Sequence, residues 1–160
     1  MLNKTVLIDT LLACRNHHER MSYAYGKIKN LIPLDEEKYR QLSGDDVSYF
    51  DQLIYRFSKL QDTMGNKLFR LILQWLEEET ETLSFLDILN KLEKLNILDN
   101  KDQWLLFREI RNEVTHEYPF NREDVIRGLN ELGKHCLLLS KIWLGMEDYC
   151  IRKFELVLPS

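Results

Sequence analysis

The stretch VIRGLNELGKHCLLLSKIWLGMEDYC (residues 125–150) carries an apolar side chain alternately every four and every three positions. These positions are Val125, Leu129, Leu132, Cys136, Leu139, Trp143, Met146 and Cys150. Because an α-helix has about 3.6 residues per turn, this spacing puts all of them in one stripe along one face. The stretch therefore predicts a long helix that buries one side against other helices.

Two further segments show the same period. One carries Leu7, Leu11, Cys14, His18, Met21, Tyr25 and Ile28, and the other carries Val47, Phe50, Ile54, Phe57, Gln61, Met64, Leu68, Leu71 and Trp75. The phase of the second segment continues unbroken across Gly65. This continuity predicts a single helix, with any bend located at the glycine.

Short polar sequences mark where the helices begin. Ser43, Ser84 and Asn121 are each followed three residues later by an aspartate, a weaker form of the capping box that normally uses Glu or Gln. Apolar pairs stand at the flanking staple positions, namely Leu42 with Val47, Leu83 with Ile88, and Phe120 with Val125. Asn100 with Gln103 marks a fourth start.

Together these signals predict an all-α protein of about five helices, at residues 5–31, 44–78, 84–96, 101–117 and 121–155. Long helices joined by short links pack as an up-and-down antiparallel bundle. The 6 Gly and 3 Pro in 160 residues are too few for a protein built from many short strands. No repeat, low-complexity segment or linker divides the chain, so we expect residues 1–160 to form a single domain.

Composition and charge limit the functional classes. The net charge of −4 argues against a general nucleic-acid coat, but it leaves room for a small site that acts on one scissile phosphate. No run of about 18 apolar residues exists, so we expect no membrane contact, and the N-terminal segment, interrupted by Asp9, is a poor signal peptide. Cys14, Cys136 and Cys150 fall on apolar stripes, which indicates reduced core residues of a cytoplasmic protein.

Two strongly polar residues interrupt the apolar stripes. His18 is either a ligand or acid–base group, or a core histidine with a hydrogen-bond partner, and we favour the second interpretation because buried polar groups are paired. Gln61 lies at a similar depth if the first two helices are antiparallel, which makes it the first candidate partner. His17 is expected to face solvent. The acidic run Glu77–Glu81 indicates a solvated charge cluster rather than a metal site, because no histidine is spaced to join it.

The stretch REIRNEVTHEYPF (residues 108–120) carries the residues best suited to chemistry. Its apolar positions are expected to face the core, which leaves a polar face with Arg111, Asn112, Thr115 and His116. Pro119 stops the helix, so His116 and Tyr118 are expected at an exposed end. Arg111 and His116 differ by about 140° around a helix and therefore cannot meet within one chain. A two-fold partner that lays the same helix antiparallel would bring two arginines and two histidines into one cleft.

These side chains have a plausible joint chemistry. Histidine is suited to proton transfer near neutral pH, and arginine carries a permanent charge on a fork that fits phosphate oxygens. With Arg111 offsetting the charge that develops on the phosphorane, His116 could help an RNA 2′-hydroxyl attack the adjacent phosphate without a metal. Asn112 lies one turn from His116 on the same side.

The sequence from Arg111 to Tyr118 matches the pattern Arg-x-x-x-x-His-x-Tyr of one protein family, with His116 at the histidine position. In this motif, and in its place just before the last long helix, the chain resembles the HepT-like toxins of the HEPN superfamily. Asn112 follows the arginine, as a polar residue commonly does in that superfamily. The resemblance implies a metal-independent endoribonuclease toxin, an RNA hydrolase without a cofactor. It also implies that Arg111 and His116 are catalytic at a homodimer cleft, with Asn112 and Tyr118 in support.

The resemblance further implies a partner. HepT-like toxins are commonly encoded beside a minimal nucleotidyltransferase antitoxin, which can add AMP to the motif tyrosine, here Tyr118, and block the RNA site. Some relatives are described only as substrate-binding subunits of such transferases, so a non-catalytic helical partner subunit is the alternative. A helical interaction module unrelated to this family is a third possibility. Tyr118 can also simply pack its ring against Phe120. The sequence assigns no role to the connection at residues 31–43.

Overall fold

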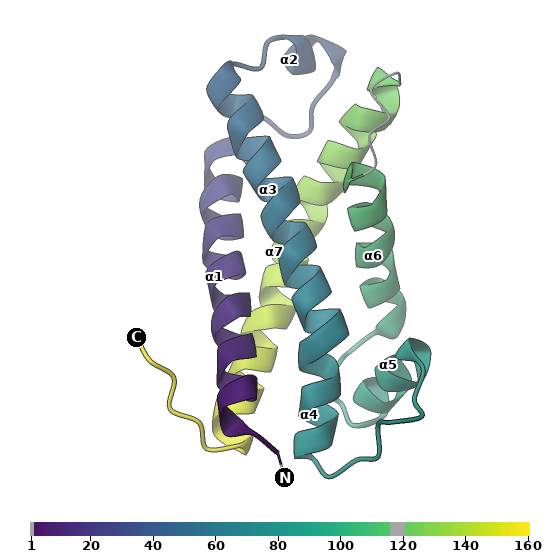
Figure 1. Ribbon diagram of the computed structural model, residues 1–160. Coiled ribbons are helices and arrows are strands. Elements are labelled where there is room, and N and C mark those ends of the chain that lie inside the picture. The colour runs from purple at the N-terminus through teal and green to yellow at the C-terminus, as the bar shows by residue number, and fades with distance from the viewer. Residues whose placement is uncertain (1, 116–120) are drawn as a thin grey trace.

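The computed structural model describes residues 2–115 and 121–160, and its regular elements are all helical. They are α1 (Lys4–Ile28), α2 (Glu36–Arg40), α3 (Gly44–Thr63), the π-helical segment η1 (Met64–Leu68), α4 (Phe69–Trp75), α5 (Phe85–Lys94), α6 (Lys101–Thr115) and α7 (Arg122–Lys153). Helix α1, the run from α3 to α4, helix α6 and helix α7 alternate in direction along one long axis (Figure 1). The short helices α2 and α5 lie in the connections. The predicted all-α antiparallel bundle is confirmed.

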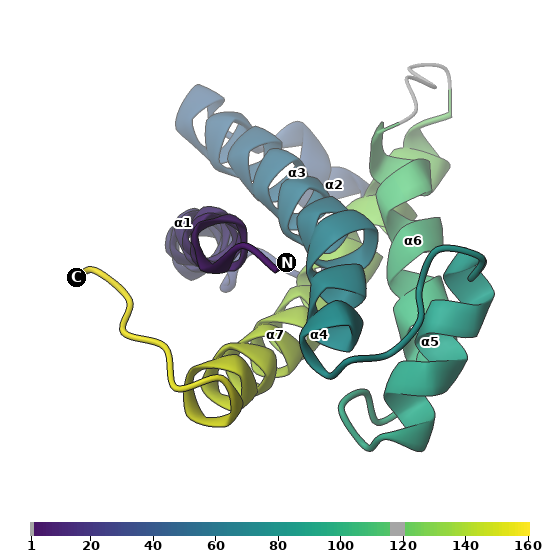
Figure 2. The same ribbon diagram turned by 60° about the horizontal axis from the view of Figure 1, so that its bottom comes forward.

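One hydrophobic core lies among the four long segments. Figure 2, turned toward the end of the bundle, shows α1, α3, α7 and α6 around a common interior. The apolar stripe predicted for residues 125–150 is buried from Leu129 to Cys150, and both Trp104 and Trp143 are completely buried. The three cysteines are also buried and free, as predicted, and burial raises the pKa of each thiol to about 12. None of the helices in the described ranges has the length and apolar character needed to span a bilayer.

The helix predicted at 44–78 is continuous from Gly44 to Trp75, but it becomes π-helical over Met64–Leu68. A π-turn holds an extra residue, which shifts the direction of the side chains that follow it. The shift occurs at Gly65, where an added β-carbon would lie 3.4 Å from Nε1 of Trp104. Glycine thus lets the indole pack close to the helix backbone. The prediction of one helix is confirmed, but the predicted unbroken phase is wrong after the π-turn. Ile72 and Leu73 are buried there, whereas Leu71 and Trp75 of the predicted stripe are only partly buried.

Helix starts follow the predicted caps. Ser43 and Ser84 each form a complete capping box with the aspartate three residues later. Asn121 accepts a hydrogen bond from the backbone N–H of Asp124, and Asn100 accepts one from that of Asp102. The end predicted for the fourth helix, at residue 117, lies outside the described residues.

The connection between α1 and α3 is anchored to α7. The amide of Asn130 accepts from the backbone N–H of Leu34 at 2.6 Å and donates to its carbonyl at 2.9 Å. Beside it, a β-carbon at Gly133 would collide with Cδ1 of Ile32, so glycine admits that side chain. The segment also contains α2, capped by Asp35, which the sequence analysis did not predict. Five residues are too few for a helical period to be recognised.

One predicted side-chain pair is wrong. His18 is only partly buried, and its Nε2 lies 2.5 Å from Oγ of Ser140 on α7, not beside Gln61. Gln61 is 2% exposed, and its Oε1 has no hydrogen-bond partner in the described chain. The expectation of a hydrogen-bonded histidine is confirmed, but its partner comes from α7. The apolar period of α1 could not show which neighbouring helix faces position 18.

Candidate functional site

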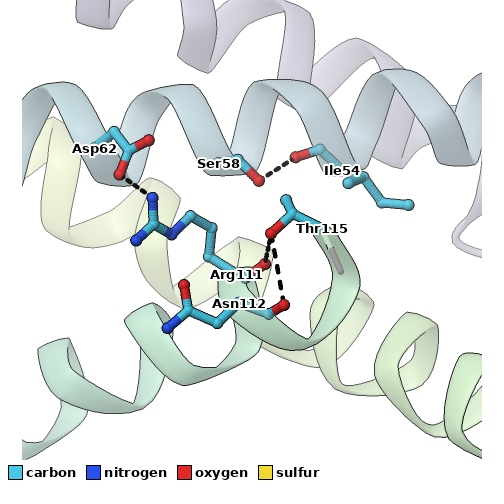
Figure 3. Close-up of polar contacts among 6 residues, drawn as sticks. All are labelled: Ile54, Ser58, Asp62, Arg111, Asn112 and Thr115. Carbon is cyan, nitrogen blue, oxygen red and sulfur yellow. Dashed lines mark hydrogen bonds and ion pairs between the residues drawn. The ribbon is translucent and has the colours of Figure 1, made fainter. Parts of the chain in front are cut away.

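Arg111 is held against α3 by an ion pair with Asp62 (Figure 3). Its Nη1 donates to Oδ1 of Asp62, and the two side chains are 23% and 33% exposed. Nε of Arg111 is buried without a hydrogen-bond partner among the described residues. The guanidinium thus bridges α6 and α3. The sequence analysis placed Arg111 on the polar face of α6 but did not identify Asp62 as its partner, because a single helix's period does not reveal the neighbour packed on that side.

Asn112 and Thr115 lie on the exposed side of α6, as predicted. Figure 3 draws no polar contact between the side chain of Asn112 and the ion pair. Thr115 donates through Oγ1 to the carbonyl of Arg111 at 2.7 Å, one turn earlier in its own helix. Such a bond satisfies the hydroxyl locally, so Thr115 contributes to the shape of the site more than to its polarity.

His116 and Tyr118 lie outside the described residues, together with Pro119 and Phe120. Of the four predicted site residues, the structure therefore places Arg111 and Asn112. These two are adjacent in sequence, but Arg111 is paired with Asp62 whereas the side chain of Asn112 is exposed. The grouping of Arg111 with His116 stays a prediction.

An open groove of about 430 Å³ lies beside Arg111's partner, between α3 and α6. Its lining residues are Asp51, Ile54, Tyr55, Ser58, Lys59, Asp62, Val114 and Thr115. The volume is within the range of small-molecule sites. Ser58 is already satisfied, because its Oγ donates to the carbonyl of Ile54 at 2.7 Å. The polar groups that remain to meet a ligand are the amine of Lys59, the phenol of Tyr55 and the carboxylates.

A histidine of α1 lies close to the cations of α3. Nη1 of Arg56 donates to Nδ1 of His17 at 3.0 Å, which requires that nitrogen to be unprotonated. Burial, and after it the charges of Arg56 and Lys59, lower the pKa of His17. His17 is partly buried, so the expectation that it faces solvent is wrong. The sequence placed it beside His18 but gave no sign that Arg56 of another helix covers it.

The acidic run after α4 behaves as a charge cluster. Glu78 forms an ion pair with Lys91 of α5 at 2.9 Å, and both side chains are 35% exposed. Within residues 2–115 and 121–160, no group of three or more His, Cys, Asp or Glu side chains is arranged to hold a metal ion.

Sequence reasoning missed Asp62 as a site residue. Asp62 follows Gln61 at the border of the apolar stripe of α3, four residues after Ser58. A carboxylate at such a border is a signal that some cation of a neighbouring helix is close. The position of Asp62 in the sequence could not identify Arg111 as that cation, because the register of α3 against α6 depends on packing throughout the bundle.

Comparison with known proteins adds no relative. No protein-family model matches the chain, and no match was found among curated proteins or solved structures. The resemblance to the HepT-like toxins therefore stays a prediction carried by residues 111–118. Function must be argued from the site itself, since a helical bundle is compatible with many activities.

Proposed function

We propose that this protein is a metal-independent endoribonuclease of the HEPN type, with Arg111 and His116 as its catalytic residues. The observation that supports this function best is the ion pair that fixes Arg111 at the edge of the groove between α3 and α6. An arginine serves as an electrostatic catalyst when its position is set before the substrate arrives. Asp62 supplies that positioning.

The ion pair leaves part of the guanidinium available. A guanidinium has five N–H groups, of which one is bonded to Asp62 and one is on the buried Nε. The remaining N–H groups are on Nη1 and Nη2, and they can donate to the non-bridging oxygens of a phosphate. In this role Arg111 offsets the negative charge that grows on the phosphorane, while Asp62 keeps the arginine aligned.

The proposed reaction uses the RNA's own 2′-hydroxyl. Its proton passes to the neutral imidazole of His116 as the O2′–P bond forms. The P–O5′ bond then breaks, and the leaving 5′-oxygen takes a proton from the second imidazole of the cleft, in its protonated form. The products are a 2′,3′-cyclic phosphate and a 5′-hydroxyl, and no metal or other cofactor takes part.

The proposed active unit is a homodimer in the cytoplasm. If the helical turn continues to His116, this residue is separated from Arg111 by about 140°, and one chain cannot aim both at one phosphate. Two copies of α6 related by a two-fold axis would place both residue types on each side of a shared cleft. The three buried cysteines, free of disulfides, are in keeping with a reducing compartment.

Regulation by a minimal nucleotidyltransferase antitoxin is part of the same proposal. AMP added to Tyr118 would carry a phosphate near Arg111, where it would compete with RNA for the guanidinium. Asn112, which is exposed and adjacent to Arg111, would support binding of the substrate.

The ion pair also favours a second candidate function. Asp62 neutralises the charge of Arg111, so the same arrangement would serve a non-catalytic subunit in which the pair only joins α6 to α3. In that case the chain would act as the helical partner of a nucleotidyltransferase. The two functions differ in a single respect that can be measured directly, namely the cleavage of RNA.

Purified protein incubated with tRNA and total RNA, with and without EDTA, separates these functions. The ribonuclease is expected to cleave RNA equally well in both conditions, and His116→Ala is expected to be inactive. His18→Gln is the matched control, because it removes a histidine that contacts Ser140 of α7, away from the proposed site. Intact RNA after incubation with the wild-type protein would favour the non-catalytic subunit.

A further inference from the structure

Four cations and three tyrosines gather where α1 and α3 pack side by side. They are Arg20, Tyr23 and Lys27 of α1, and Tyr49, Tyr55, Arg56 and Lys59 of α3, and we call this surface the α1/α3 tract. Cζ of Arg20 lies 4.7 Å from the ring centroid of Tyr23, and Nζ of Lys27 lies 5.4 Å from the same centroid. The rings of Tyr23 and Tyr49 meet edge to face across the two helices at 6.2 Å.

The other half of the tract continues along α3. Cζ of Arg56 and Nζ of Lys59 lie 5.3 Å and 5.7 Å from the ring centroid of Tyr55. Tyr55 and Lys59 also line the groove between α3 and α6. Helix α3 lies between α1 and α6 in both ribbon views (Figures 1 and 2). The tract is therefore continuous with the groove beside Asp62 and Arg111.

The charge of the tract contrasts with that of the chain. The protein has a net charge of −4, with 26 acidic residues. Even so, Arg20, Lys27, Arg56 and Lys59 form no ion pair within residues 2–115 and 121–160. The carboxylates nearest along the sequence of α3 are those of Asp51 and Asp62, which line the groove, and Asp62 is paired with Arg111. On α1 the exposed carboxylate of Glu19 precedes Arg20, so the tract carries more cations than carboxylates in an otherwise acidic molecule.

Two of the three tyrosines of the tract are open to a partner, while Tyr49 is partly buried. Tyr23 is 45% exposed and Tyr55 is 52% exposed, which is high for large apolar rings. Neither ring belongs to the buried core of the bundle. Exposed aromatic rings interleaved with arginine and lysine are the combination with which proteins hold single-stranded nucleic acid, because bases stack on the rings while the cations meet the phosphates.

We propose that the α1/α3 tract binds a single-stranded segment of RNA and leads it to the groove beside Arg111. This inference rests on the proposed ribonuclease function and adds a binding surface outside its catalytic motif. The rings of Tyr23 and Tyr55 stack on bases at the two ends of the tract. Arg20, Lys27, Arg56 and Lys59 neutralise the phosphates between them. The tract holds the strand, and Arg111 acts on the phosphate that reaches the groove.

Other anionic partners fit the surface less well. An anionic membrane would be bound by cations together with apolar side chains that enter the acyl region, and the aromatic residues of the tract are all tyrosines. An acidic protein segment would be attracted by the cations alone, and exposed rings would add little. Single-stranded RNA is the partner that uses both features.

The test measures binding of a fluorescent 2′-O-methyl oligoadenylate, which cannot undergo attack by a 2′-hydroxyl, to the full chain at several salt concentrations. Four phosphate contacts predict a slope of log K against log salt of about −2.8. Arg20→Gln with Lys27→Gln is expected to reduce that slope to about −1.4. Tyr23→Ala is expected to weaken binding about tenfold, whereas Tyr23→Phe keeps the ring and binds as the wild type does.

Two lysines outside the tract provide the control. Lys94 of α5 and Lys141 of α7 are both exposed, and their double replacement by glutamine removes the same charge as the tract variant. Thermal melts establish that each variant is folded. The proposal is overturned if the control lowers affinity as much as the tract variant does, or if Tyr23→Ala binds as the wild type does. Inorganic polyphosphate and anionic phosphatidylserine vesicles are tested as competitors of the oligoadenylate. If either displaces it as well as unlabelled oligoadenylate does, and Tyr23→Ala does not change that displacement, the tract binds by charge alone and the proposal is overturned.

The outcomes for the tract and for the ribonuclease are separable. If RNA is cleaved in a manner that needs His116, and Tyr23→Ala raises KM for long RNA about tenfold with kcat unchanged, both proposals hold. Cleavage that needs His116, but with the same KM in wild type and Tyr23→Ala, overturns the tract alone. Binding of the oligoadenylate that depends on Tyr23, without any RNA cleavage, overturns the ribonuclease and supports the tract.

Discussion

The ion pair between Asp62 and Arg111 gives a prediction that depends on the structure alone. Replacing Asp62 by alanine removes the acceptor from a guanidinium that is 23% exposed and whose Nε is already without a partner in the described chain. Loss of a hydrogen bond between charged groups costs about 1.5–3 kcal/mol, and solvent screening of this partly exposed pair lowers the expected loss to about 1.5 kcal/mol. For a chain of this size the melting temperature should fall by about 4 °C.

A double-mutant cycle measures the interaction itself. Asp62→Ala, Arg111→Ala and the double variant are each unfolded in urea, with circular dichroism as the signal. The sum of the two single losses of unfolding free energy should exceed the loss in the double variant by about 1 kcal/mol. The reason is that each single variant leaves one charge without its partner. The control cycle uses Glu113 and Arg127, which lie 3.5 Å apart with side chains 46% and 59% exposed.

The control pair should give a coupling energy near zero, because solvent screens both of its charges. If the losses of unfolding free energy for Asp62→Ala and Arg111→Ala are additive, with a coupling energy near zero as for the control pair, the reasoning is refuted. Such a result would mean that the guanidinium is not held by Asp62 in solution. The proposal of a preset arginine at the groove would then lose its support.

Three further outcomes are expected. Asn130→Ala should lower the free energy of unfolding by about 2 kcal/mol in urea titrations, because two hydrogen bonds to the backbone of Leu34 are lost. An unchanged urea midpoint would contradict the anchoring of the connection between α1 and α3 to α7. Burial lowers the pKa of His18 below its usual 6.5 in the folded chain, so as the pH falls the unfolded chain takes up the proton before the folded chain does. The free energy of unfolding should therefore decrease below about pH 6.5, and His18→Gln should flatten this part of the pH profile. Tyr118→Phe should keep its RNA cleavage but escape neutralisation by the nucleotidyltransferase, and intact-mass analysis after co-expression should show AMP on the wild-type chain alone.

The helices could be predicted from sequence because their signals are local. An apolar period is a property of one segment, and the caps at Ser43 and Ser84 involve residues only three positions apart. The helix continues through the π-turn at Gly65, but the extra residue moves the buried stripe to Ile72 and Leu73, which the apolar period alone could not show. Helix α2 was missed for the opposite reason, since five residues contain little more than one turn.

The contacts between helices could not be predicted in the same way. His18 meets Ser140, His17 meets Arg56 and Arg111 meets Asp62, and each pair joins two helices. Which residues face each other across two helices depends on their relative rotation and axial register. Both are determined by how the whole core packs, and no short stretch of sequence records them. The positions of His116 and Tyr118 in relation to Arg111 are still predictions from the motif.

The central claim is most directly tested by the ends that the protein leaves on RNA. Wild-type protein in EDTA should convert an end-labelled RNA into fragments with 2′,3′-cyclic phosphate and 5′-hydroxyl ends, and it should leave the same sequence intact when every 2′-hydroxyl is methylated. His116→Ala should produce no fragments at the same concentration, while His18→Gln should match the wild type. Cleavage that continues in His116→Ala, that needs a divalent metal, or that proceeds on the methylated RNA would contradict the account.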